Sequence, residues 1–153
     1  MMNTETANEK GTENYVISSW EDERLNLHTS LLRGIYAFGF EKPSPIQCKA
    51  LGPMTSSKNR DIIAQAQSGT GKTGAFVVGV LQKLCDAKPE TINHTFALVL
   101  APTHELASQS MKVFKRISKF IKPEVRIELI VGGTSIEDNK QSLTQNKPQI
   151  VVG

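Results

Sequence analysis

Between a short apolar run and a segment of helical character, the chain reads Ala66-Gln67-Ser68-Gly69-Thr70-Gly71-Lys72-Thr73. This is the context of a phosphate-binding loop, in which a strand leads in and a helix leads out. Gly69 and Gly71 can adopt positive φ, so that backbone N–H groups and the helix N-terminus point at an anion. Lys72 would reach the β- and γ-phosphates, and the Thr73 hydroxyl would bind Mg²⁺. We therefore predict a nucleoside triphosphate site, although Ala66 stands where the general pattern has its first glycine.

Around this loop, apolar runs of strand length alternate with segments long enough for helices. Strands are expected at residues 62–64, 96–100, 127–131 and 150–152, and helices at 72–84, 105–120 and 136–145. Such alternation predicts right-handed crossovers and a parallel sheet with helices on both faces. The fold class is therefore α/β, a parallel-sheet P-loop NTPase domain.

The N-terminal third divides into a tail and a helical segment. Residues 1–14 are polar, acidic and poor in aromatics, which predicts a disordered tail. Residues 15–60 contain a helical apolar stripe that begins at Leu25 and stops at Gly39, and a short second helix after Ser44-Pro45. Residues 61–153 form the expected nucleotide-binding domain.

Composition narrows the classes of protein to consider. The 153 residues carry a net charge of +3, and five of the bases fall within residues 112–122. That basic run is either a solvated helix face or a surface that attracts anions. Cys48 and Cys85 show neither a disulfide framework nor a zinc-site spacing, and the sequence has no membrane-length apolar run and no signal-peptide pattern. We expect a reduced intracellular compartment, cytoplasm or nucleus, with no membrane partner.

The loop alone is compatible with several classes of P-loop protein. A guanine-specific GTPase is disfavoured, because the nearest string to its Asn-Lys-x-Asp motif is Asn139-Lys140-Gln141-Ser142, which lacks the Asp and lies in an expected helix. A small-molecule kinase is not excluded by the loop itself. The flanking sequence has to discriminate between these classes.

Four motifs occur in order and in register: residues 39–47, 66–73, 101–107 and 132–133. Together they resemble the opening motifs of the DEAD-box RNA helicases, and residues 31–43 resemble most the branch that includes the helicase of translation initiation. The resemblance covers residues 20–153 and implies the N-terminal RecA-like lobe of such an enzyme.

The same resemblance implies an adenine pocket. The motif that ends at Gln47 is the adenine sensor of the family, and an amide supplies the donor and the acceptor that an adenine edge needs. Trp20 stands at the upstream aromatic position near the base, and Phe40 and Lys42 help to line the pocket. From the residues alone, Trp20 could also be a core aromatic, and Gln47 could be a residue on a helix surface.

Two further segments are implied to hold RNA by its backbone, without reading its sequence. They are Pro102, Thr103, His104 and Glu105, and then Gly132, Gly133 and Thr134. The second segment could also be a simple strand-to-helix turn. His104 departs from the family, which usually has Arg here, so a permanent charge is replaced by an imidazole.

No Asp-Glu-Ala-Asp string follows the last expected strand, so the acidic residues that hold Mg²⁺ and activate water are missing from the sequence. Lys72 and Thr73 are the catalytic residues present. We interpret the chain as an incomplete domain, the N-terminal part of an ATP-dependent RNA helicase that uses ATP and Mg²⁺ to unwind short RNA duplexes. Translation or RNA-processing factors are the expected protein partners. The alternative is a non-catalytic nucleotide- or RNA-binding module.

Overall fold

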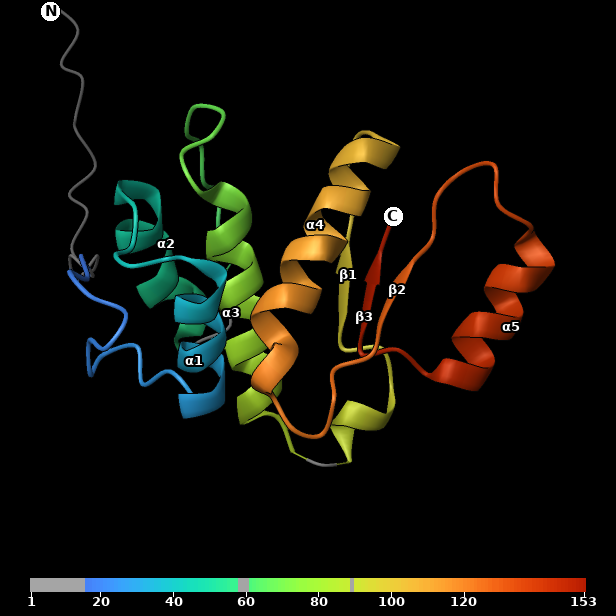
Figure 1. Ribbon diagram of the computed structural model, residues 1–153, viewed down its shortest axis with the longest axis horizontal. Coiled ribbons are helices and arrows are strands. Elements are labelled where there is room, and N and C mark those ends of the chain that lie inside the picture. The colour runs from blue at the N-terminus through green and yellow to red at the C-terminus, as the bar shows by residue number, and fades with distance from the viewer. Residues whose placement is uncertain (1–15, 58–60, 89) are drawn as a thin grey trace, which may run out of the picture.

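A computed structural model describes residues 16–57, 61–88 and 90–153. The expected tail at residues 1–14 lies outside these ranges. The described elements, shown in Figure 1, are α1 (Thr29–Phe38), α2 (Pro45–Thr55), α3 (Lys72–Asp86), η1 (Thr91–Asn93), β1 (Ala97–Val99), α4 (His104–Ile117), η2 (Ser118–Phe120), β2 (Ile127–Leu129), α5 (Ile136–Asn146) and β3 (Ile150–Val152).

The three strands form one parallel sheet, which confirms the prediction of a parallel α/β fold. The strand order is β1-β3-β2, so the last strand in the sequence lies in the middle. Ile150 of β3 is in register with Ala97 of β1 on one side and with Ile127 of β2 on the other. The central strand is buried throughout its length, as expected for a strand with neighbours on both sides.

Helices α1 to α4 pack in front of and beside the sheet (Figure 1). Helix α2 runs against α3, and α4 packs against α3, β2 and β3. One apolar cluster joins these elements, with Leu31 of α1, Leu51 of α2, Val77 of α3 and Phe114 of α4 all buried. The helical N-terminal segment and the nucleotide-binding segment therefore share a single core.

The expected strand at residues 62–64 is wrong. Residues 61–67 form no strand, and Ile62 and Ile63 are exposed. A β-strand needs a neighbour to pair with its N–H and C=O groups, and no described strand lies beside this segment. An apolar run alone therefore does not make this segment a strand, because the described residues offer it no strand to pair with.

Local capping signals place several helix ends. The Thr103 hydroxyl accepts from the Leu106 N–H at 3.2 Å, and the Ser135 hydroxyl accepts from the Asp138 N–H at 3.3 Å. Gly39 ends α1 in the left-handed conformation, φ 102°. Helix α2 contains Pro53 and continues to Thr55. None of the helices in the described ranges is long and apolar enough to cross a membrane.

Candidate nucleotide and RNA site

Three loops lie at the same end of the molecule, at the top of Figure 1. They are the loop before α3, the loop between β1 and α4, and the loop between β2 and α5. The last two follow the carboxyl ends of parallel strands, which is where open α/β sheets bind their ligands. The structure thus brings the nucleotide segment and both RNA segments predicted from the sequence to the same edge.

The phosphate-binding loop has the backbone that its glycines predict. Gly69 and Gly71 have φ of 76° and 101°, and Gly71 is the residue before α3 begins. The Lys72 ammonium lies folded over the loop, where it donates to the carbonyl oxygens of Ala66, at 2.6 Å, and Gln67, at 2.5 Å. An anion that enters the loop would therefore take Lys72 away from these two carbonyls.

Gln47 connects α2 to this loop. Its side-chain Nε2 donates to the Gly71 carbonyl at 3.1 Å, and its Oε1 accepts from the Ser44 backbone N–H at 2.7 Å. The residue is only 2% exposed, so it is not a surface residue of the helix. Each amide atom keeps one further bonding position, because an amide nitrogen has two hydrogens and an amide oxygen two lone pairs.

Ser44 is a contributor that the motif reading did not single out. It is the N-cap of α2, and Gln47 stands three residues on, at the position whose side chain returns to the N-cap N–H. The Ser44 hydroxyl is buried beside Gly71 and has no hydrogen-bond partner among the residues that the structure describes. The spacing Ser-x-x-Gln before a helix is the sequence signal that predicts this contact.

Two glycines inside α3 lie against neighbouring elements, and at Gly74 the packing leaves no room for a side chain. A Cβ at Gly74 would lie 2.6 Å from Nε2 of Gln47 and 2.8 Å from Cε2 of Phe40. A Cβ at Gly79 would lie 3.1 Å from Cβ of Met54. The first turn of α3 therefore touches two of the residues implied to hold adenine.

The aromatic part of the implied adenine pocket is packed inward. Trp20 is 1% exposed and stacks on Phe40, with ring centroids 6.1 Å apart and an interplanar angle of 13°. The Trp20 indole N–H is buried without a partner in the described part of the chain. Lys42 is exposed. Trp20 thus has the burial of a core aromatic, and its contact with a base stays a prediction.

The segment that holds Trp20 is fixed by an ion pair. The Arg24 guanidinium bonds the Asp22 carboxylate at 2.6 Å and also the Val16 carbonyl at 3.0 Å. The hydrogen bond from Arg24 lowers the pKa of Asp22 from 3.8 to about 2. Both side chains are close to solvent, so the pair positions the segment locally.

The two segments implied to bind RNA lie against each other. Pro102, Thr103, His104 and Glu105 are exposed, and so are Gly132, Gly133 and Thr134. A Cβ at Gly132 would lie 3.3 Å from Nε2 of His104, so the imidazole rests on the glycine backbone. Gly133 has φ of 86°, and the Thr134 hydroxyl donates to the Val131 carbonyl at 2.8 Å.

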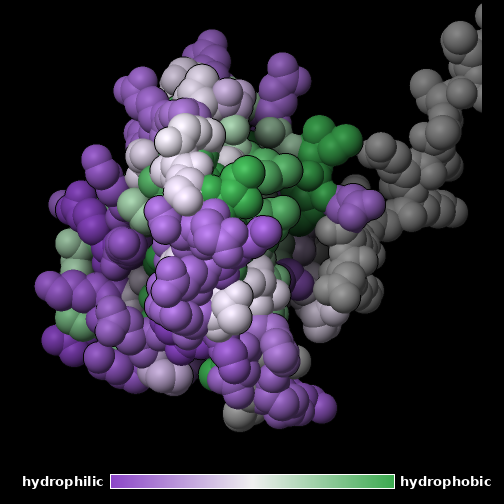
Figure 2. Space-filling model, turned by 90° about the vertical axis from the view of Figure 1, so that its right-hand side faces the viewer, coloured by the Kyte–Doolittle hydropathy of each residue, from purple (hydrophilic) through white to green (hydrophobic). Residues whose placement is uncertain are grey.

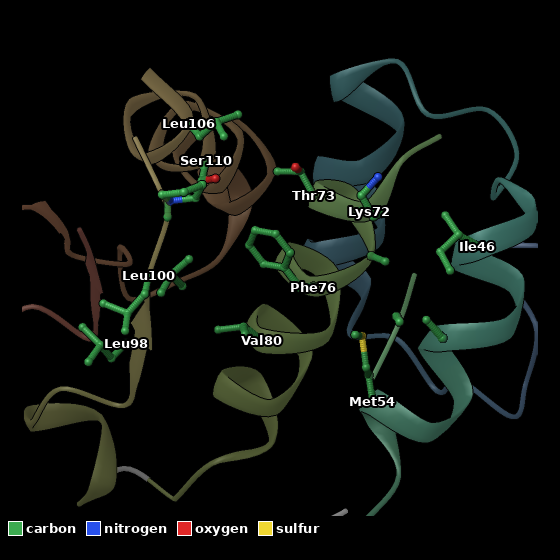
Figure 3. Close-up of a pocket in the computed structure, with 16 residues that line it drawn as sticks. Ile46, Met54, Lys72, Thr73, Phe76, Val80, Leu98, Leu100, Leu106 and Ser110 are labelled. Carbon is green, nitrogen blue, oxygen red and sulfur yellow. The ribbon is translucent and has the colours of Figure 1, made fainter. Parts of the chain in front are cut away.

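A cavity of about 600 Å³ opens between the phosphate-binding loop and β1 (Figure 3). Most of its wall is apolar, with Met54 and Phe76 on the helical side and Leu98 and Leu100 on the strand side (Figure 3). Lys72, Thr73 and Ser110 are its polar side chains. Phe40, Lys42 and Gln47 do not line it, so it is separate from the implied adenine pocket.

The basic run follows the exposed surface of α4 and η2. Arg116 lies over the ring of Phe38 at 4.4 Å, and Lys119 lies 5.8 Å from the ring of Phe120. Among residues 16–57, 61–88 and 90–153 the salt bridge found is Arg24–Asp22, so no described acid neutralises this run. No group of three His, Cys, Asp or Glu residues in the same ranges could hold a metal ion.

Known proteins share the sequence of this site and of the fold around it. The model of the DEAD/DEAH box helicase family matches residues 44–153. This chain belongs to that family. An ATP-dependent RNA helicase eIF4A from Chaetomium globosum is 47% identical over 137 residues, which is 90% of this chain and 32% of the relative. The chain therefore spans about one third of the length of such relatives.

Solved structures of the family show the same RecA-like fold. Saccharomyces cerevisiae Dbp5 L327V bound to RNA and ADP BeF3 matches with a TM-score of 0.71 and 37% identity, over 90% of this chain and 32% of that one. Mss116p bound to ssRNA and AMP-PNP matches with a TM-score of 0.78 and 30% identity, over 86% of this chain and 26% of that one. The identification of a DEAD-box helicase lobe from sequence motifs is thereby confirmed.

Proposed function

We propose that this chain is the part of an ATP-dependent RNA helicase that binds the nucleotide and one side of the RNA backbone. The observation that supports this most directly is the hydrogen bond from Gln47 to Gly71, which joins the implied adenine sensor to the phosphate-binding loop. The relatives are named RNA helicases, and two similar structures contain RNA and a nucleotide analogue.

In this proposal the residues of the loop act on the triphosphate. Lys72 leaves the carbonyls of Ala66 and Gln67 and pairs with phosphate oxygens, while the N–H groups from Ser68 to Gly71 surround the phosphates. Mg²⁺ would be held by the Thr73 hydroxyl together with phosphate oxygens, and it would neutralise their charge. Gln47 and Phe40, with Trp20 and Lys42 beside them, would select adenine.

RNA would lie across the exposed edge formed by Pro102–Glu105 and Gly132–Thr134. The N-terminus of α4 carries a partial positive charge, and glycines let a phosphate approach the backbone closely. His104 rests between the two segments, so it would contact the RNA with an imidazole in place of a guanidinium. Such contacts position a strand without reading its bases. Free Cys48 and Cys85 are consistent with a reducing compartment, cytoplasm or nucleus.

A titration with a fluorescent ATP analogue and MgCl₂ tests the nucleotide site. We expect binding by the chain and a loss of about tenfold or more in affinity for Lys72→Ala, because the ammonium contacts the phosphates directly. Lys140→Ala on α5 is the matched control and should bind like the parent chain. Equal affinity of both variants would contradict the proposed site.

Steady-state hydrolysis separates binding from catalysis. We expect the chain to bind ATP without turning it over, because hydrolysis needs acidic and cationic groups at the γ-phosphate beyond Lys72 and Thr73. The whole helicase would supply these groups from other parts of its sequence. ATP hydrolysis that disappears in the Lys72→Ala variant would show instead that this chain is an enzyme by itself.

Salt-dependent RNA binding tests the RNA edge. His104→Arg adds a permanent cation at the predicted contact, so it should tighten binding of single-stranded RNA and steepen the plot of log K against log salt by about 0.7. Gln141→Arg adds the same charge on α5, away from the two segments, and should change the slope less. An identical change in both variants would place His104 outside the RNA path.

A further inference from the structure

The basic run of α4 lies on the side of the helix that faces away from the core. The buried residues of this helix are Ala107, Ser110, Phe114 and Ile117. At 3.6 residues per turn, Lys112, Lys115 and Arg116 fall within an arc of about 100° on the opposite side. All three are exposed, so their charges are available to a partner.

Helix α1 adds a further cation to this surface because it packs tightly on the end of α4. A Cβ at Gly34 would overlap the carbonyl oxygen of Ile117, so glycine is needed for this close approach. The approach places the Arg33 guanidinium 4.3 Å from the centre of the Phe120 ring in η2. The exposed sides of α1, α4 and η2 therefore form one continuous surface.

Two arginines are held by aromatic rings across the seam between α1 and α4. Arg33 of α1 lies on Phe120, and Arg116 of α4 lies on Phe38 at the end of α1. Stacking uses one face of a guanidinium and leaves its N–H edges for other partners. Within the described ranges neither guanidinium has a hydrogen-bond or ion-pair partner. Both are thus positioned in advance for a ligand from outside.

The positive charge of this surface is not balanced by nearby acids. We define the basic face as Arg33, Lys112, Lys115, Arg116 and Lys119, all of them exposed. The acids on or beside its elements are Glu105 in the first turn of α4, Glu124 after η2, and Glu21, which accepts from the Tyr36 hydroxyl at 3.2 Å. In the part of the chain that the structure describes, none of them forms a salt bridge with the face.

The surface of α5 provides a contrast. Figure 2 shows the side of the molecule that carries α5, and much of this side is hydrophilic. Helix α5 has no buried residue, and it combines acidic Glu137 and Asp138 with basic Lys140. Solvated surfaces generally carry both signs of charge, interspersed. A surface of one sign, as on α4, is instead typical of one that attracts an oppositely charged partner.

We propose that the basic face docks an acidic segment of another polypeptide. The two stacked guanidiniums suit the planar carboxylates of Asp and Glu, which can accept two parallel N–H bonds from one arginine. Arginines and aromatic rings are also enriched at the centres of protein–protein interfaces. Lys112, Lys115 and Lys119 surround this centre and would attract the acidic segment from a distance.

RNA is the alternative anion, and the position of the face disfavours it. The RNA edge lies at the N-terminus of α4, and Lys112 is about 12 Å further along the helix than His104, at ~1.5 Å per residue. Glu105 and Gln109 stand between them on the same side of the helix. A strand that leaves the edge would meet a carboxylate and an amide before the first cation. The inference therefore goes beyond the proposed function and does not depend on it.

The test selects binders from a displayed library of random 12-residue peptides, with the whole chain as bait. We expect the selected peptides to be rich in Asp and Glu. Arg33→Gln with Arg116→Gln should weaken a synthetic representative by about tenfold or more, because both bidentate partners are lost. Lys49→Gln with Lys140→Gln removes the same charge from exposed positions on α2 and α5. This matched control should change the affinity by less than about threefold, because distant surface charges are screened.

Two further pairs of variants separate recognition from folding. Lys112→Gln with Lys115→Gln leaves both arginine stacks intact and should still weaken the peptide severalfold. Arg33→Lys with Arg116→Lys keeps the charge but loses the planar fork, so it should restore only part of the affinity. Fluorescence of the single tryptophan during urea denaturation checks that each variant is folded.

Several results would overturn the proposal. They are selected peptides without an excess of acids, equal losses in the arginine pair and the matched control, and full affinity in the lysine-substituted arginine pair. Loss of peptide binding in Lys72→Ala would also overturn it, since the peptide would then occupy the phosphate-binding loop. A 12-nucleotide single-stranded RNA is the competing probe. A larger loss for this RNA than for the peptide in the Arg33→Gln, Arg116→Gln chain would assign the face to nucleic acid.

Discussion

The phosphate-binding loop has two flanks that differ in packing. On the α2 flank, Gln47 is buried, bonds Gly71, and fits so closely against Gly74 that no Cβ is tolerated there. On the β1 flank, an apolar cavity separates the loop from Leu98 and Leu100, whose side chains face solvent. Both flanks are apolar in sequence, so composition does not distinguish them.

The difference shows which side of the phosphate-binding loop is packed by other residues of this chain. The α2 flank is built from residues 40–55 and 71–82, which are close enough in sequence to fold against each other as helices. On the β1 flank, β1 pairs only with β3 among the described strands, so its other side is a free sheet edge. A phosphate-binding loop can therefore be firmly held on one side and unsupported on the other.

The largest effect is expected from Gly74→Ala. The added methyl group would overlap Gln47 and Phe40, which costs more than the ~1 kcal/mol gained in helix propensity, so we expect a net loss of about 1–2 kcal/mol in unfolding free energy. Urea denaturation measures this. Gly79→Ala meets only the flexible Met54 and should be nearly neutral. Equal losses in both variants would show that the α2 flank is not specially tight.

A double-mutant cycle tests whether the overlap is with Gln47. Gln47→Ala removes the amide that the new methyl group would meet, so Gly74→Ala should cost less in that background. We expect a coupling of about 1 kcal/mol, in the range found for residues in contact. Additive losses would indicate that Phe40 alone resists the methyl group. Urea denaturation of the four chains supplies the cycle.

On the β1 flank, Leu98→Ser with Leu100→Ser should leave the unfolding free energy within ~0.5 kcal/mol of the parent value, because both side chains already face solvent. The solubility limit should rise, since an exposed apolar edge favours association. Ile136→Ser serves as a control for exposed apolar residues away from the edge. A marked loss of stability would mean that this edge is packed in solution.

The smallest effect is local and depends on pH. Arg24 holds the pKa of Asp22 at about 2, below the ~3.9 of an unfolded chain, so the ion pair stabilises the fold above about pH 4 and this contribution is lost as the pH falls toward 2. Trp20 fluorescence should report a loosening over that window. Asp22→Asn removes the titrating carboxylate, so the fluorescence change of the parent chain in this pH window should be absent or smaller in the variant. Identical fluorescence profiles of the parent chain and the variant against pH would contradict this role of the ion pair.

Local sequence signals predicted much of the fold and the composition of the site. The glycines and Lys72 predicted the loop, and apolar runs predicted all three strands of the sheet. These features depend on neighbours within a few residues, which a linear reading contains. The prediction of a strand at residues 62–64 is wrong because a strand needs a pairing partner, and the presence of such a partner cannot be seen from neighbouring residues in the sequence.

The site residues divide in the same way. The resemblance to the DEAD-box helicases singled out Gln47, Trp20 and His104 as expected site residues. It did not predict that Gln47 is buried against Gly71, that Trp20 stacks on Phe40, or that His104 rests on Gly132. Each of these contacts joins segments 20 or more residues apart. Their distances follow from how the helices and the sheet pack.

The chain's residues alone therefore establish its fold class, its phosphate-binding loop and the family motifs, because backbone conformation and charge at these positions are set by residue type. Folding in three dimensions establishes that Lys72 turns onto its own loop and that one flank of the loop is closed while the other is open. The physical reason is that burial and hydrogen bonding between distant segments depend on the packing of the whole core, which no single stretch of sequence specifies.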